Sequence, residues 1–167
     1  MFNKGEYIIY GNMGICEIID ISTLDINGAP KDKLYYILKP INEDKSKVFT
    51  PVDNKKVTIR RIISKEDCEN LLNDIPNIKE LAVENEKLRE KAYKECIRSC
   101  QCRQLISLIK TIYSRKEERL NQGKKLSATD EKYFKLAQNN LQTELAISLK
   151  VSIEDMEDYI LNKVQNS

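Results

Sequence analysis

The spacing of apolar residues changes near residue 63, and this change limits the folds that the chain can adopt. Before it, short runs rich in isoleucine, tyrosine and valine alternate with turn residues, as is typical of β strands. After it, apolar residues recur three and four positions apart, as is typical of amphipathic helices. A chain of 167 residues is long enough for two small domains. We therefore expect a β domain over residues 1–62 and a helical domain over residues 63–167.

The β domain is predicted to contain five short strands. Turn signals separate them, including Gly11 to Gly14 and the pair Asn27-Gly28 within the loop 24–33. Pro51 favours an edge position or a strand end for the fourth run, because proline cannot donate a backbone hydrogen bond. Short strands with frequent turns predict a small, strongly bent antiparallel barrel. The expected strands cover residues 6–10, 15–21, 34–38, 47–52 and 57–61.

The helical domain carries start signals and apolar stripes. A serine followed three residues later by an aspartate marks helix starts at Ser64, Ser127 and Ser152. The stripes predict one buried face on each of the later helices. Their members are Leu105, Leu108, Ile109 and Ile112, then Phe134, Ala137, Leu141 and Leu145, then Met156, Ile160 and Val164. The fold class is therefore α+β, with a compact bundle of about five helices after the barrel.

Charge is distributed unevenly along the chain. Residues 87–135 carry a net charge of +8, whereas residues 63–86 carry −5 and residues 136–167 carry −3. Concentrated positive charge indicates an anionic partner, with nucleic acid as the first candidate. A solvated helical surface explains the charge equally well.

Missing residue types and motifs exclude several functions. The chain has no histidine, which removes the commonest general base and imidazole metal ligands. It also lacks a phosphate-binding glycine loop and a convincing pair of catalytic carboxylates. We expect neither an enzyme nor a cofactor. The chain has no run of 18 apolar residues that could form a membrane span, and its first residues do not resemble a secretion signal. We therefore expect a cytoplasmic protein.

The two halves together resemble the CarD/CdnL-type bacterial transcription regulators over roughly residues 2–162. The first half resembles a module that this family shares with transcription-repair coupling factor. Its pattern is Phe2-x-x-Gly5-Glu6-x-Ile8-x-Tyr10-x-x-x-Gly14-Ile15-Cys16-x-Ile18. The second half resembles the family's helical domain in the segments 93–95, 108–113, 115–119, 126–132 and 144–146.

The resemblance implies that the first domain is a Tudor-like barrel that docks on the β subunit of RNA polymerase. In the family, an exposed strand lies beside a strand of the partner, so that backbone hydrogen bonds supply affinity. Phe49 stands where many relatives have arginine. It is either an apolar anchor or a side chain that points into the barrel. The matching positions are Leu24, Lys47, Val48, Phe49, Thr50 and Pro51.

The resemblance also implies that the helical domain contacts promoter DNA upstream of the melted region and stabilises the open complex. Basic side chains would bind phosphates without reading sequence. Well-studied relatives insert a tryptophan at the edge of the open DNA, and this chain has none. Leu88 is either a smaller wedge or a core residue. The matching basic positions are Arg89, Lys91, Lys94, Lys124, Lys125 and Lys132. We expect a monomer.

Two alternatives remain open at this stage. The absent tryptophan suggests an adaptor that docks on polymerase without touching DNA. Cys96, Cys100 and Cys102 lie within seven residues and suggest a thiol or metal sensor, since three thiolates could hold zinc with one external ligand. No paired CxxC motif supports such a site, so buried thiols are the simpler interpretation and we expect no metal.

Overall fold

The computed structural model describes residues 1–166 and divides them into two compact units. The first unit is Met1–Ile62, and the second begins at Ile63. Among the described residues, no helix has both the length and the apolar character needed to cross a membrane.

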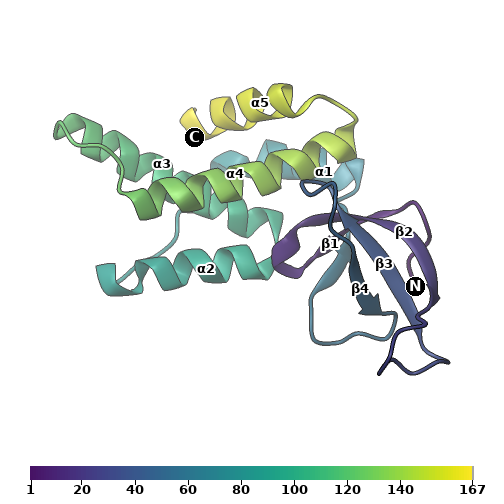
Figure 1. Ribbon diagram of the computed structural model, residues 1–167. Helices are drawn as coiled ribbons and strands as arrows, with labels where there is room; N and C mark the ends of the chain where they lie inside the picture. Colours follow the sequence, from purple (N-terminus) through teal and green to yellow (C-terminus); the bar gives the residue numbers. More distant parts are fainter. Residues whose placement is uncertain (167) are drawn as a thin grey trace. The chain divides into compact units, whose positions relative to one another are not determined.

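The first unit is a five-stranded antiparallel sheet, as predicted, and the structure gives the strand order as β4-β3-β2-β1-β5 (Figure 1). The pairing of β2 with β3 shifts register between Ile18 and Asp20, and such a bulge bends a strand and increases its twist. The Tudor-like class inferred from the resemblance is confirmed. The strands are β1 Tyr7–Tyr10, β2 Ile15–Thr23, β3 Leu34–Pro40, β4 Val48–Pro51 and β5 Ile59–Arg61.

The connection between β1 and β2 depends on glycine. Gly11 begins a short 3₁₀ turn, η1 Gly11–Met13, with a φ of 47°, and Gly14 follows it with a φ of 72°. A Cβ atom on Gly11 would lie 2.7 Å from Cγ1 of Val57, closer than real carbon atoms approach. A side chain is therefore excluded at Gly11 by both its backbone angle and its neighbour.

Alternate residues of the central strands form the core of the sheet. Tyr36 is almost completely buried, and its hydroxyl oxygen accepts a hydrogen bond from the backbone N–H of Phe2 at 3.0 Å. The Phe2 ring packs on Tyr36 with ring centroids 5.9 Å apart. The buried members of this core are Ile8, Cys16, Ile18, Tyr36 and Leu38. One face of the sheet is thus filled, and the strand alternation turns the intervening residues to the other face, where Ile9 and Ile15 are also buried.

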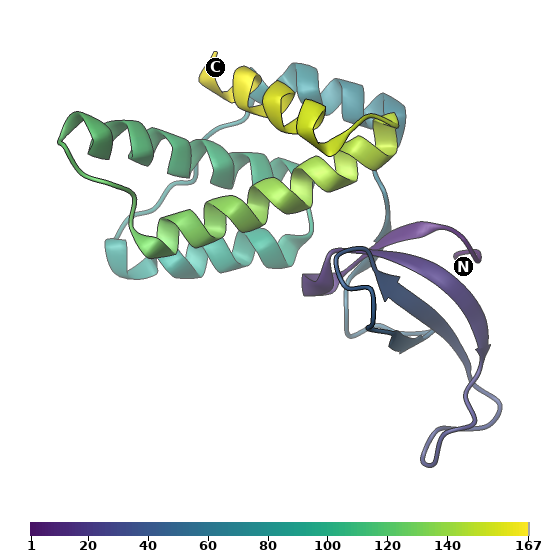
Figure 2. The same ribbon diagram turned by 45° about the horizontal axis from the view of Figure 1, so that its top comes forward.

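Over residues 63–166 the second unit contains five α-helices, which confirms the predicted bundle (Figures 1 and 2). Two 3₁₀ turns, η2 Ile75–Asn77 and η3 Glu86–Leu88, lie between the first and second helices. The helices are α1 Lys65–Asp74, α2 Arg89–Ser99, α3 Cys102–Asn121, α4 Ala128–Leu149 and α5 Ile153–Gln165.

Serine caps begin three of these helices, as the sequence predicts. In each case the serine hydroxyl accepts a hydrogen bond at 3.1 Å from the backbone N–H of the aspartate three residues later. This bond satisfies one of the N–H groups that have no partner within the helix. The pairs are Ser64 with Asp67, Ser127 with Asp130, and Ser152 with Asp155.

The predicted apolar stripes form the core of the helical unit. Ala137, Leu141 and Leu145 are completely buried, and the stripe of α5 is buried as well. Phe134 differs, because it is only partly buried near the start of α4 and lines a surface groove there with Leu126. The burial of the stripes fixes which side of each helix faces solvent.

Candidate interaction surfaces

Strand β4 lies at one edge of the sheet, where it pairs only with β3 among the described strands. The backbone N–H of Val52 donates to the carbonyl of Leu34 at 3.0 Å. Hydrogen-bonded and non-hydrogen-bonded pairs alternate along an antiparallel ladder. Val52 and Leu34 therefore form a hydrogen-bonded pair. Phe49 lies three residues before Val52 and opposite Ile37, so it belongs to a non-hydrogen-bonded pair, and its N–H and C=O face away from β3. The edge therefore offers the backbone of Phe49 to a further strand.

The side chains of β4 divide between the two faces of the sheet. Phe49 is 44% exposed, so its side chain does not point into the barrel, which was one of the two interpretations from the sequence. Thr50 is only 2% exposed, and Val48 packs against the buried residues of the sheet. The side chains of Val48 and Thr50 therefore face the core of the sheet and not the surface that a partner would contact.

Two further residues, which were not predicted as contact positions, extend the apolar surface around Phe49. Ile37 is opposite Phe49 and Tyr35 is opposite Pro51, and both are partly exposed. The alternation of β3, with Tyr36 and Leu38 turned inward, was the signal that could have found them. Of the other predicted positions, Lys47 is exposed just before the strand, and Leu24 is partly buried just after β2.

The predicted basic residues gather at one end of the helical unit. Figures 1 and 2 show that the N-termini of α2 and α4 and the C-terminus of α3 lie at the same end of the bundle. Tyr133 of α4 donates a hydrogen bond to Glu90 of α2 at 3.1 Å, which joins these helix starts. The exposed lysines are Lys91 and Lys94 on α2, Lys124 and Lys125 between α3 and α4, and Lys132 on α4. We call these five residues the basic end.

Two of these lysines make weak contacts with neighbouring side chains. Nζ of Lys94 lies 3.7 Å from Oε1 of Glu90, and Nζ of Lys132 lies 5.3 Å from the ring centroid of Tyr133. Both contacts are on the surface, where such interactions contribute little to stability. The positive charges are therefore available to an anionic partner.

Arg89 is engaged differently from the lysines. Its guanidinium donates three hydrogen bonds of 2.8–3.1 Å to the carboxylate of Glu86, and its side chain is only 17% exposed. These hydrogen bonds lower the pKa of Glu86 below its usual value. Arg89 is thus tied to its own helix start, and the sequence did not reveal this partner.

A polar network extends from exposed Glu86 at this helix start to buried Asp130 inside the bundle. Arg115 of α3 lies between Glu86, at 3.2 Å, and Asp130 of α4, at 3.0 Å. The same Asp130 accepts a hydrogen bond of 2.7 Å from the hydroxyl of Tyr93. Burial, reinforced by this bond, raises the pKa of Tyr93 to about 12. The network fixes the corner between η3 and α2 against α3 and α4.

Leu88 stands on this fixed corner. It is the last residue of η3 and is 49% exposed, so it is not part of the core. Glu86 and Arg89, on either side of it, belong to the network described above, and its own backbone N–H donates to the carbonyl of Asn85 at 2.9 Å.

Comparison with known protein families divides the chain in the same way. A family model described as the CarD-like/TRCF RID domain matches residues 2–63. A second, described as the CarD C-terminal domain, matches residues 70–161. The chain belongs to the CarD family. The resemblance stated from the sequence is therefore confirmed, although a search of the curated proteins finds no match.

Membership of the CarD family gives the broad function. CarD-family proteins are transcription regulators and not enzymes, and the RID domain is an RNA polymerase-interacting domain. This CarD-family chain is therefore a transcription-related protein that interacts with RNA polymerase. The edge strand β4 belongs to the first matched region, and the basic end belongs to the second.

The cysteines of this CarD-family chain are buried thiols. The Sγ atom of Cys102 donates to Oε2 of Glu144 at 3.3 Å, and that of Cys96 donates to Oε1 of Gln104 at 3.6 Å. Burial raises the pKa of Cys96 to about 11, which opposes the thiolate form that oxidants and metals require. Residues 1–166 contain no cluster of three metal-ligating side chains. These observations give the sensor interpretation no support.

Proposed function

We propose that this protein binds the β subunit of RNA polymerase through β4, contacts upstream promoter DNA through the basic end, and stabilises the open complex. It acts as a cytoplasmic monomer in this proposal. The observation that carries the proposal is the match of both CarD family models, in order, along one chain.

The edge of β4 supports the docking half of the proposal. Adding a strand to an exposed edge supplies affinity through backbone hydrogen bonds and specificity through side chains. Phe49 presents its backbone to the free edge and its ring to one face, beside Ile37 and Tyr35. A complementary strand of the polymerase would pair with this backbone and cover these apolar side chains.

The basic end supports the DNA half of the proposal. Lysines from α2, α4 and the connection before α4 provide positive charge for phosphates. The N-termini of α2 and α4 lie at the same end and add positive potential, which the C-terminus of α3 partly offsets (Figure 2). Docking on polymerase raises the local concentration of this surface near DNA, so that a modest charge is sufficient.

Differential binding gives the mechanism in this proposal. A protein that binds the open complex more tightly than the closed complex shifts the equilibrium by the difference in affinity. Leu88 supplies such a difference, because an apolar side chain contacts an unstacked base step only when the duplex is distorted. The basic end adds to this difference in affinity where its lysines contact phosphates along the path of the opened DNA.

The test is the lifetime of open complexes formed by the cognate RNA polymerase, measured after a competitor challenge at several salt concentrations. Replacing Lys124 and Lys125 with glutamine should shorten the lifetime and reduce its salt dependence, because each lost phosphate contact lowers the slope by about 0.9. The matched control replaces Lys65 and Lys79, which are exposed lysines of the same unit away from the basic end.

The outcomes separate the proposal from a polymerase-docking adaptor. If both double variants bind polymerase and give lifetimes equal to the unmodified chain, the protein does not contact DNA through the basic end. If the full chain itself leaves the lifetime unchanged while bound to polymerase, the proposed effect on the open complex is wrong.

A further inference from the structure

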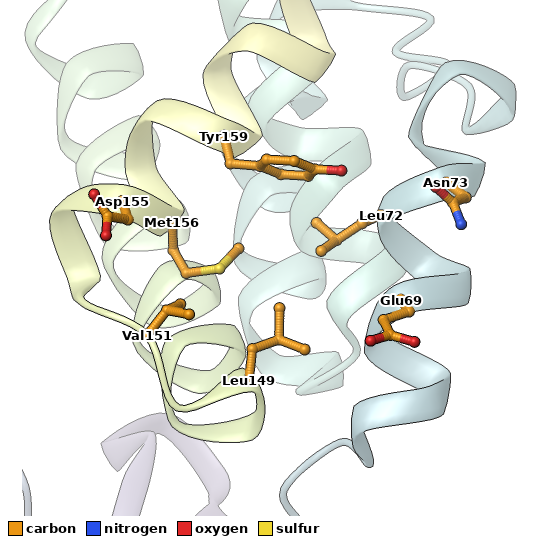
Figure 3. A pocket seen from close by; sticks show the side chains of 8 residues that line it. All are labelled: Glu69, Leu72, Asn73, Leu149, Val151, Asp155, Met156 and Tyr159. Atoms are coloured by element: carbon orange, nitrogen blue, oxygen red, sulfur yellow. The ribbon is translucent and has the colours of Figure 1, made fainter.

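A groove on the helical unit lies between α1, the end of α4 and α5 (Figure 3). It has a volume of about 400 Å³, within the range of sites that enclose small ligands or side chains of a partner. Its lining residues come from chain segments about 80 positions apart. They are Glu69, Leu72, Asn73, Leu149, Val151, Asp155, Met156 and Tyr159.

The floor and walls of this groove are apolar. Met156 and Leu72 are buried at its base, whereas Tyr159 and Val151 are 44% and 45% exposed on its walls. Figure 3 shows Tyr159 and Met156 extending from α5 toward Leu72 of α1. Methionine adapts its shape to different partners, and an exposed tyrosine supplies a large contact area at little cost in side-chain entropy.

The rim of the groove is acidic. Glu69 and Asp155 lie on opposite sides of it in Figure 3. The two helices that supply them, α1 and α5, each carry four acidic residues and one lysine. The lysine of α5, Lys163, lies with Nζ 5.6 Å from the ring centroid of Tyr159 and leaves the net charge negative. This charge opposes the binding of nucleic acid and favours a cationic partner.

We propose that this groove binds an amphipathic helix of a partner protein, whose apolar face is flanked by lysine or arginine. The apolar side chains of the helix would enter between Leu72, Met156 and Tyr159, and its basic residues would lie near Glu69 and Asp155. Helix-in-groove recognition of this kind uses apolar anchors spaced three and four residues apart. The site is separate from the edge strand and from the basic end, and it does not depend on the function proposed above.

Three synthetic helical peptides test the proposal with the full-length protein. They share one leucine face, and their polar face carries lysine, glutamine or glutamate. The lysine peptide should bind at least tenfold more tightly than the glutamate peptide at low salt. In amide NMR spectra it should shift the signals of residues 69–73, 149–151 and 155–159. Equal binding of the three peptides, or shifts confined to other residues, would overturn the proposal.

Matched variants locate the charge and apolar contributions. Glu69→Lys should weaken binding of the lysine peptide several-fold, whereas Glu95→Lys, the same charge change at an exposed position of α2, should not. Tyr159→Ser should also weaken it, whereas Leu120→Ser, at an exposed leucine of α3, should not. Circular dichroism confirms that each variant is folded. Equal losses in variants and controls, or self-association of the protein that covers the groove, would contradict the proposed occupant.

Discussion

Nε of Arg115 donates to Oδ2 of Asp130 at 3.0 Å, and this ion pair joins α3 to α4. Asp130 is only 1% exposed, and its other carboxylate oxygen accepts the hydroxyl of Tyr93 from α2. Its backbone N–H also binds the capping Ser127. One residue in the first turn of α4 thus connects this helix to two others.

Asp130→Ala should destabilise the helical unit by about 3–5 kcal/mol, because it leaves Arg115 and Tyr93 without their buried partner. Urea unfolding followed by circular dichroism measures the loss. Glu131→Ala is the control, since Glu131 is exposed and its ion pair with Lys135 is worth at most about 1 kcal/mol. Equal stability of the two variants would show that the network contributes nothing.

Phe49→Pro should reduce binding to the polymerase β subunit more than Phe49→Ala does. Both variants lose the ring, but only proline also removes the N–H that faces the free edge. The difference reports one backbone hydrogen bond, worth about 0.5–1.5 kcal/mol. Equilibrium binding of the full chain measures it. Val48 is unsuitable for this test, because its backbone pairs with β3 and proline would disrupt the sheet itself.

Leu88→Ala should shorten the open-complex lifetime roughly tenfold if Leu88 enters the DNA, since burying a leucine is worth about 1.5–3 kcal/mol. Its stability should hardly change, because the side chain is exposed in the free protein. Leu136→Ala, at another exposed leucine of the same unit, is the control. A lifetime equal to that of the unmodified chain would exclude Leu88 as the wedge.

Lys150→Gly should stabilise the helical unit by about 1 kcal/mol. Lys150 ends α4 with a φ of 57°, a left-handed conformation that glycine adopts without strain. Val151 donates to the carbonyl of Ala146 at 3.1 Å and completes the C-terminal cap. Thermal unfolding measures the change. Lys150→Ala also removes the lysine but keeps the strain, so a melting temperature equal to that of the glycine variant would refute this reason.

The stability of the protein should fall as the pH rises from about 9 to 11. Burial raises the thiol pKa values of Cys16, Cys68 and Cys96 from 9.0 to about 11. Over this interval the unfolded chain releases the thiol protons while the folded chain keeps them, so unfolding becomes more favourable. Urea unfolding at several pH values tests this. Cys68→Ala should show a shallower fall, and an unchanged slope would rule out the contribution of that thiol.

Local structure was predictable because its causes lie within a few residues of one another. The glycine turn between Gly11 and Gly14, the serine caps and the three- and four-residue spacing of apolar side chains act over short distances. They located the strands and the helix starts, and they identified the buried faces of α4 and α5. The charge of residues 87–135 was likewise visible in the chain itself.

The availability of each side chain could not be predicted, because it depends on which segments meet in the folded protein. Arg89 and Lys91 are both basic residues at the start of the same predicted helix. In the structure Arg89 forms an ion pair with Glu86, whereas Lys91 is exposed. Phe49 faces outward only because the register with β3 turns Thr50 inward.

The sequence by itself therefore determined the two parts, their elements and their family. The tertiary structure alone decided the partners of Asp130 and brought Leu72 to Met156 in one groove. The physical reason is that backbone propensity and capping are local interactions, whereas burial, ion pairing and grooves arise between residues distant along the chain.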